Sequence, residues 1–247
     1  MKRIFAVLLA LSLLLLAACS KGVSPTEPSQ TEPATEPSQP EEKGPFTVTY
    51  AHAQADTHGS GEVWVQLLAE VTNTGSEPLT LGAADWTVCT PDGTELAVRK
   101  GVSAYPQTIE PGEKGWYYDE FTVDTAQTGE LAVQYDGDAL AASVRTAEQG
   151  SMRYTVSDVN LKDSVYGGVE LTGRIRNDTA EQGSLVCVAA VLLDESEKPL
   201  GVVYTVLGSP LEAGAETTFG MSSEMLPPEV KSADIAQVET FAYPLAE

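Results

Sequence analysis

The stretch from Leu171 to Gly201, LTGRIRNDTAEQGSLVCVAAVLLDESEKPLG, decides how the fold of this chain is predicted. An earlier stretch, Leu67 to Ala97, reads LLAEVTNTGSEPLTLGAADWTVCTPDGTELA and has the same order of apolar runs and turn residues. An offset of 104 positions, the separation of residues 73 and 177, aligns the two stretches without a gap. Farther along, an offset of 102 places IEPGEKGWY (109–117) on LEAGAETTF (211–219). The alignment predicts one structural unit that occurs twice.

Apolar residues alternate with polar ones in both copies, and short turn signals such as Asn-Thr-Gly and Pro-Asp-Gly separate the runs. This pattern is typical of the short strands of an all-β sandwich. We therefore predict an all-β chain with two tandem immunoglobulin-like β-sandwich domains, residues 46–146 and 152–244, joined by the polar segment TAEQGS. The residues expected to face the two cores are Val63, Val65, Leu67, Ala69 and Val71 in the first copy, and Val169, Leu171, Gly173 and Ile175 in the second.

The N-terminus begins MKRIFAVLLALSLLLLAACS, a short basic start followed by an apolar run from Ile4 to Ala18. That run is shorter than the roughly 20 residues of a membrane-spanning helix and is typical of an export signal. Its end, Leu16-Ala17-Ala18-Cys19, resembles the lipobox of bacterial lipoproteins. The resemblance implies a signal peptide over residues 1–18, a lipidated Cys19, and acyl chains that hold the protein on the extracytoplasmic side of a bacterial membrane. An ordinary secretory signal with a chance cysteine is the alternative.

Residues 19–45 contain SKGVSPTEPSQTEPATEPSQPEEKGP after the cysteine, a segment rich in Pro, Glu and Thr. Such a composition cannot bury enough apolar surface to offset the ordering entropy, so it predicts a disordered linker between the anchor and the first sandwich. The whole chain has 36 acidic and 14 basic side chains and a formal charge of −22. This charge argues against nucleic acid as a partner.

The second copy resembles the FxLyD domains, small immunoglobulin-like domains of bacterial lipoproteins. The namesake motif falls on Ala190, Leu192, Leu193 and Asp194, with alanine where an aromatic residue is expected. The first copy has the aromatic residue, Trp86, but a threonine in place of the aspartate. The resemblance implies a fold and a location in the cell envelope, and it supplies no catalytic residues.

Candidate catalytic and metal sites are few. The sequence has only two histidines, His52 and His58, both in a glycine-containing connection, and it has no recognised nucleophile or phosphate-binding motif. His52, Asp56 and His58 are suitable zinc ligands, but their spacing matches no specific site, so we interpret them as loop residues. The acidic run at 194–197 is interpreted as a hairpin tip, not a calcium loop. We therefore predict no enzyme activity, no metal and no cofactor.

Cys89 and Cys187 remain besides the candidate lipid-modified cysteine, and they occupy positions that do not correspond in the two copies. Both lie in apolar runs, which favours buried free thiols. A disulfide between the two domains stays open as an alternative in an oxidising compartment.

The one candidate binding surface is aromatic. If the predicted inward residues face the first core, alternation places Trp64, Trp116 and Tyr118 on the outer face of two neighbouring strands. The corresponding positions of the second copy are polar or small, so an aromatic cluster on one copy alone indicates an interaction site. The alternative is that the second copy or the connection over residues 97–107 covers this face.

These observations favour a lipid-anchored extracytoplasmic envelope protein that acts as a non-enzymatic binding module for a protein, a peptide or a cell-wall component. A structural accessory or spacer subunit of a membrane complex, with no ligand of its own, is the runner-up. A solute-capturing lipoprotein is disfavoured because the chain lacks alternating strand and helix segments.

Overall fold

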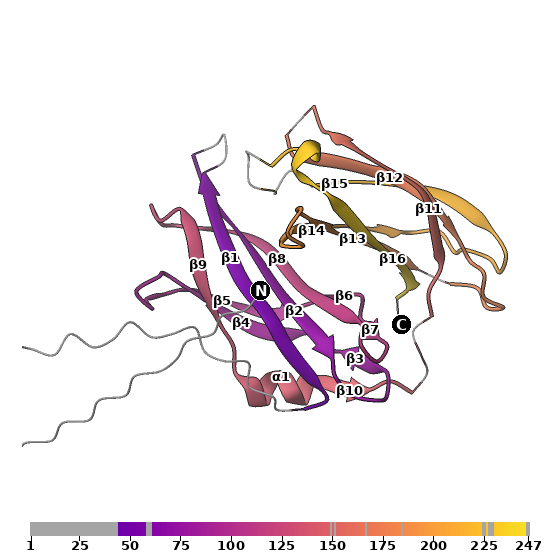
Figure 1. Cartoon of the computed structure of the whole chain (residues 1–247), viewed down its shortest axis with the longest axis horizontal. Helices are drawn as coiled ribbons and strands as arrows, with labels where there is room; N and C mark the ends of the chain where they lie inside the picture. The colour runs from indigo at the N-terminus through magenta and orange to yellow at the C-terminus, as the bar shows by residue number, and fades with distance from the viewer. Residues whose placement is uncertain are drawn as a thin grey trace, which may run out of the picture. The chain divides into compact units, whose positions relative to one another are not determined.

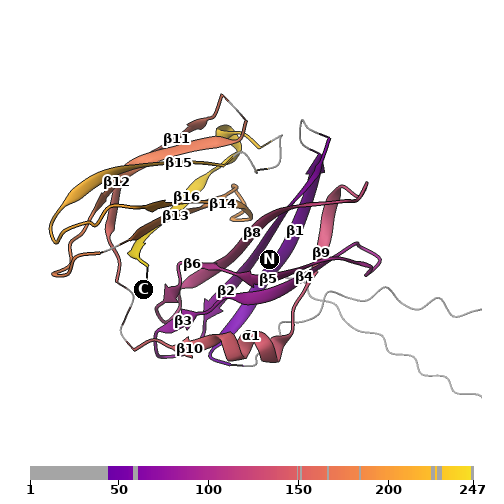
Figure 2. The ribbon, with the colours of Figure 1, turned by 180° about the vertical axis from the view of Figure 1, so that it is seen from behind.

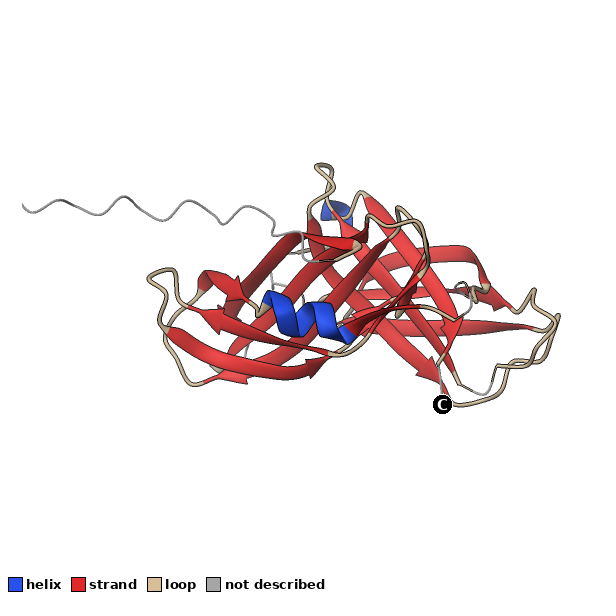
Figure 3. Ribbon diagram, turned by 90° about the horizontal axis from the view of Figure 1, so that it is seen from below, coloured by secondary structure: helices blue, strands red, loops and turns tan. Residues whose placement is uncertain are grey.

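The structure is a computed structural model that describes residues 44–57, 61–148, 150, 152–165, 167–183, 185–223, 226 and 230–245. The predicted signal peptide, Cys19 and nearly all of the predicted linker lie outside the described residues. The described residues belong to one compact unit. They are almost entirely antiparallel β-structure, as Figure 3 shows in red, so the predicted all-β fold class is confirmed. No helix within the described part of the chain is long and apolar enough to cross a membrane.

The first sandwich is built around a seven-stranded sheet in the order β5-β4-β9-β1-β2-β8-β6. Strand β9 joins its two layers because it pairs with β1 over Ala53–Ala55 and with β4 over Thr87–Cys89. A small sheet in the order β10-β3-β7 and one helix, α1, complete this part of the chain. The elements are β1 (Phe46–Thr57), β2 (Val63–Asn73), β3 (Leu79–Leu81), β4 (Ala84–Cys89), β5 (Glu95–Val102), β6 (Ala104–Tyr105), β7 (Thr108–Ile109), β8 (Lys114–Val123), β9 (Gly129–Gln134), α1 (Gly137–Ser143) and β10 (Val144–Thr146).

The second sandwich has two three-stranded sheets with the orders β11-β12-β15 and β14-β13-β16 (Figure 1). Its strands are β11 (Thr155–Asp163), β12 (Val169–Arg176), β13 (Val186–Leu193), β14 (Pro199–Leu207), β15 (Glu216–Ser223) and β16 (Gln237–Pro244), with a short 3-10 turn, η1 (Ser232–Asp234), before β16. All the strand pairs of both sheets are antiparallel. The apolar side chains between the two sheets form a core of their own.

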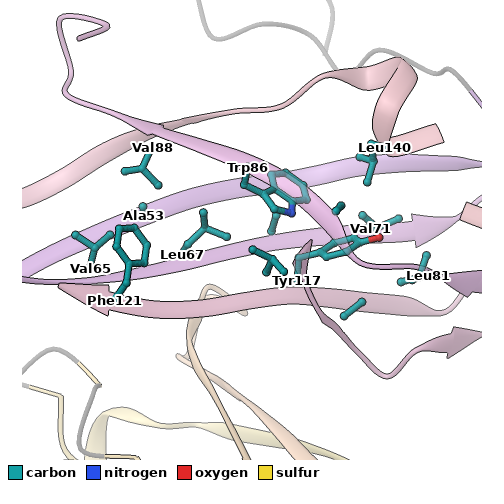
Figure 4. Close-up of a cluster of buried hydrophobic side chains, with 14 of the residues drawn as sticks. Ala53, Val65, Leu67, Val71, Leu81, Trp86, Val88, Tyr117, Phe121 and Leu140 are labelled. Carbon is teal, nitrogen blue, oxygen red and sulfur yellow. The ribbon is translucent and has the colours of Figure 1, made fainter. Parts of the chain in front are cut away.

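Trp86 of β4 lies at the centre of the first core (Figure 4), where its ring centroid is 5.2 Å from those of Tyr117 and Tyr135. The Tyr117 hydroxyl donates a hydrogen bond of 2.8 Å to the carbonyl of Gly82, which satisfies the one polar atom of that buried ring. The inward faces that alternation predicts are confirmed in both copies, since all nine of those residues are buried.

A buried asparagine, Asn177, follows β12, and its hydrogen bonds explain why both copies have asparagine at this position. The Asn177 side-chain amide donates to the carbonyls of Glu181 at 2.7 Å and Leu211 at 2.9 Å, and its oxygen accepts from the Thr179 amide at 3.0 Å. Asn177 is fully buried, so these bonds replace water for three backbone groups. One side chain therefore ties the end of β12 to the segment that precedes β15.

Asn73, at the end of β2, makes the same three bonds in the first sandwich. Its amide donates to the carbonyls of Glu77 at 2.9 Å and Ile109 at 3.2 Å, and its oxygen accepts from the Gly75 amide at 2.9 Å. Each partner stands at the position that the sequence offsets of 104 and 102 assign to it, since Glu77 and Gly75 shift by 104 and Ile109 shifts by 102. The aligned asparagines are thus equivalent in structure as well as in sequence.

The β13–β14 hairpin closes on Asp194, the aspartate of the FxLyD-like motif. Its carboxylate accepts from the Ser196 amide at 2.8 Å and the Lys198 amide at 2.9 Å. In the first copy Thr90 takes this position, and its hydroxyl accepts from the Thr94 amide at 3.1 Å. The interpretation of the acidic run as a hairpin tip is confirmed, with the carboxylate occupied by backbone amides of its own turn.

Candidate functional site: the junction between the two sandwiches

The outer face of β2 and β8 carries the aromatic residues that the sequence indicated. In the antiparallel register Leu68 lies opposite Tyr118, and Glu70 lies opposite Trp116. Their neighbours Leu67, Ala69 and Tyr117 point into the first core, so alternation directs these four side chains outward. Figure 1 shows the two strands side by side.

The second sandwich covers this outer face. Trp116 and Tyr118 are only 1% and 5% exposed, and they belong to a buried cluster with Leu68 and three residues of the second sandwich. Those three are Val191 and Leu193 of β13 and Val202 of β14. The expected solvent exposure is therefore wrong for Trp116 and Tyr118, and the alternative, cover by the second copy, is what the structure has.

Trp64 stands farther along the same face, opposite Thr122, and is partly buried. It is not a member of the cluster that contains Trp116 and Tyr118. The structure therefore does not bring the three predicted aromatic residues together as one exposed surface.

The partner face of the second sandwich is apolar because β13 is buried on both sides. Val186, Val188, Ala190 and Leu192 point into the second core, and the intervening residues point toward the first sandwich. The sequence VCVAAVLL is a continuous apolar run, which is typical of a strand buried on both faces. This run was the one sequence signal that could have identified the docking face.

Two tyrosines from opposite sides of the junction stack on each other. The ring centroids of Tyr105, in β6, and Tyr204, in β14, are 4.8 Å apart with an interplanar angle of 27°. Tyr204 stays 49% exposed, so this pair marks the rim of the junction. Burial raises the pKa of Tyr105 above its ordinary value, so the phenol stays neutral at physiological pH.

Arg153 anchors the segment between the two sandwiches. Its guanidinium donates to the Thr108 carbonyl at 2.9 Å and forms an ion pair with Glu113 at 3.0 Å, both in the first sandwich. It also lies over the Phe241 ring of the second sandwich, 5.3 Å from the centroid. Burial lowers the pKa of Arg153, and the carboxylate of Glu113 acts in the opposite direction. This residue and Phe241 were not among the predicted site residues.

Three polar groups, the Gln66 amide, the Tyr118 hydroxyl and the Glu120 carboxylate, border the apolar cluster. The Tyr118 hydroxyl donates to the carboxylate of Glu120 and accepts from the Gln66 amide at 3.2 Å. Burial raises the pKa of Glu120, and the hydrogen bond from Tyr118 acts in the opposite direction. Gly201 of the second sandwich lies close to Gln66. A Cβ atom at position 201 would be only 2.7 Å from the Gln66 amide nitrogen. The glycine permits this approach of the two sandwiches.

His52 is the one histidine in the described ranges, since His58 lies outside them. Its imidazole forms a contact of 3.2 Å with Glu130, and its ring lies 5.7 Å from that of Tyr50. Burial lowers the pKa of His52, while Glu130 acts in the opposite direction. The imidazole therefore sits in a strand and on the junction side of the sheet, not in the loop that the sequence predicted.

Both remaining cysteines are buried free thiols, one in β4 and one in β13. Burial raises the pKa of Cys89 and of Cys187, which disfavours the reactive thiolate in each case. The open question of a disulfide between them is settled in favour of free thiols in this structure.

Comparisons with known proteins give little information. No family model matches the chain, and no curated protein matches it. Among solved structures, a calcium-binding mutant of Bacteroides uniformis beta-glucuronidase 2 is 14% identical, with a TM-score of 0.23 over 77% of this chain and 26% of its own. A beta-glucuronidase from glycoside hydrolase family 2 is 9% identical, with a TM-score of 0.19 over 74% of this chain and 20% of its own. At these scores neither likeness bears on the fold or the activity.

Proposed function

We propose that this chain is a lipid-anchored protein of a bacterial cell envelope that acts outside the cytoplasm as a non-enzymatic binding module. Its ligand would be a protein, a peptide or a cell-wall component. The observation that carries the proposal is the arrangement of the N-terminal segments. An apolar run ends in Leu16-Ala17-Ala18-Cys19, and a proline-rich segment follows it. The resemblance of the second copy to FxLyD lipoprotein domains supports the same location.

The junction supports a binding role in one respect. A burial of large aromatic side chains between two sandwiches favours a fixed relative position of the domains, and ligand sites occur preferentially where domains meet. Loops and clefts beside such a junction keep a constant geometry, which lowers the entropic cost of binding.

A spacer subunit without a ligand is the second candidate, and one observation favours it. Trp116 and Tyr118, the residues that the sequence indicated as a recognition surface, are used within the chain to hold the two sandwiches together. A docked pair of sandwiches on a proline-rich tether would also serve to hold another subunit at a set distance from the membrane.

Lipid attachment is tested by producing the full chain in bacterial cells fed radiolabelled palmitate and isolating it in detergent. We expect label on the wild-type chain and none on Cys19→Ser, whereas Cys89→Ala, which removes a buried thiol, keeps the label. Label retained by Cys19→Ser would contradict the proposal. Isolation in detergent also distinguishes the two candidate functions. If the chain is a binding module, a partner co-isolates with it, and a single surface substitution abolishes that co-isolation. If the chain is a spacer subunit, the complex co-isolates with every single-substitution surface variant.

A further inference from the structure

A groove of about 650 Å³ opens beside the junction. Trp64 lies near one end of the paired strands β2 and β8, and the groove lies toward their other end. One wall comes from the small sheet β10-β3-β7, and the other comes from the segment before β11 and the end of β16. Figure 2 shows β3 and β10 from behind. The volume lies within the range of small-molecule sites, roughly 300–1,000 Å³.

The first wall carries a polar row. In the register of the small sheet Arg145 pairs with Thr80, and Thr80 pairs with Thr108, so the three side chains share one face. The alternate residues of these strands, Leu79 and Ile109, point into the first core, which leaves the row facing the groove. A guanidinium and two hydroxyl groups are thereby placed in line.

Arg145 is exposed and forms no ion pair with any of the described residues. Because the guanidinium of Arg145 has no carboxylate partner among the described residues, its N–H donors are available for a charge-assisted, bidentate pair with an anion. Arg153, on the opposite wall, differs because Glu113 already neutralises it. Glu148 adds one carboxylate to the lining, so a bound anion must sit nearer Arg145 than Glu148.

The second wall combines apolar side chains with the Arg153 guanidinium that Glu113 neutralises. Met152, Tyr243 and Leu245 line it, and Tyr243 is almost fully buried, so its ring is fixed in place. A ligand between the two walls would meet a free guanidinium and two hydroxyl groups on one side, and mainly hydrocarbon beside the paired Arg153 on the other. That combination suits a carboxylate carried on a short apolar body.

We infer that this groove binds such a carboxylate, with Arg145 as the group that pairs with it and Thr80 and Thr108 as hydrogen-bonding neighbours. The carboxylate would come from the C-terminal end of a peptide or from a free small organic acid. This inference rests on the proposed binding function and names the ligand class. The apolar body would lie against Met152 and Leu245.

The test is calorimetric titration of the full chain in detergent with three probes: N-acetyl-alanyl-alanine, its C-terminal amide, and butyrate. We expect the dipeptide acid to bind and the amide to bind at least tenfold more weakly, because a hydrogen bond to a charged group contributes about a factor of ten or more. Arg145→Gln is expected to weaken the acid to the level of the amide. Lys100→Gln, which removes the same charge from an exposed position of β5 outside the groove lining, is expected to leave the affinity unchanged.

Butyrate that binds as tightly as the dipeptide acid would support the carboxylate site and identify a free acid as the source. Equal affinity for the acid and the amide, an equal loss in Lys100→Gln, or no binding of any probe would overturn the inference. The proposed function is tested separately, since palmitate labelling and partner isolation do not depend on this groove.

Discussion

Replacing Trp116 with alanine is expected to lower the free energy of unfolding of the full chain by about 3–5 kcal/mol, the range for truncation of a buried tryptophan. The indole is 1% exposed and contacts a cluster drawn from both sandwiches, so the substitution leaves a cavity that neither side can fill alone. Urea unfolding of wild type and variant measures the difference. A loss below about 1 kcal/mol would be the behaviour of an exposed side chain and would contradict the burial.

Trp64→Ala provides the matched control for this experiment. The residue is of the same type and lies on the same face of β2 and β8, but it is partly buried and outside the junction cluster. We expect a clearly smaller loss of stability for Trp64→Ala than for Trp116→Ala. An equal loss in both variants would mean that the cost reflects the tryptophan type and not the junction.

Asn177→Ala is expected to cost about 1–3 kcal/mol, the range for a buried backbone group that loses its partner. The Thr179 amide loses its acceptor, whereas the Leu211 carbonyl keeps the Gly183 amide and the Glu181 carbonyl keeps the Thr179 hydroxyl. Asn177→Asp keeps the shape but removes the two donors and adds a buried charge, so it is expected to be no more stable than the alanine variant. Asn73→Ala should show a loss of similar size, because the residue makes the same bonds. Denaturant unfolding measures all three variants. A cost below about 1 kcal/mol for Asn177→Ala would contradict the stabilising role of these bonds, and clearly unequal losses for Asn73→Ala and Asn177→Ala would contradict the structural equivalence.

The strands and the inward faces could be predicted from local patterns. Val65 and Val169 belong to runs in which every second residue is apolar or glycine, and an asparagine with turn residues after it follows each run. These patterns depend only on residues a few positions apart, so they can be recognised in one sequence without knowledge of the fold. The alignment predicted that Asn73 and Asn177 occupy corresponding positions, whereas the hydrogen bonds that each side chain makes are known only from the structure.

The junction could not be predicted in the same way. Alternation correctly directed Trp116 out of the first core, but it carries no information on what lies beyond that face. The cover comes from Val191 and Leu193, and the stack between Tyr105 and Tyr204 joins residues far apart in the chain. No local pattern links these positions, because docking of two domains depends on the complementarity of whole faces. The apolar run of β13 indicated a second buried face without naming its partner.

The groove could not be predicted from the sequence either, because its residues come from separate strands and none of them has a distinctive local pattern. Arg145, Thr80 and Thr108 form one row only because β10 and β7 pair with the two edges of β3. Each residue taken alone is an ordinary polar residue beside a strand. The row, and the wall of Met152, Tyr243 and Leu245 opposite it, exist only in the folded chain.

The central claim is that the two sandwiches are docked face to face through the outer aromatic residues of the first. A double-mutant cycle with Tyr105→Ala, Tyr204→Ala and the double variant tests it most directly, because the two rings belong to different sandwiches and stack at 4.8 Å. We predict a coupling of about 0.5–1.5 kcal/mol in the free energy of unfolding, the range for aromatic pairs in contact. Additive single effects, with a coupling of zero within error, would contradict the docked arrangement.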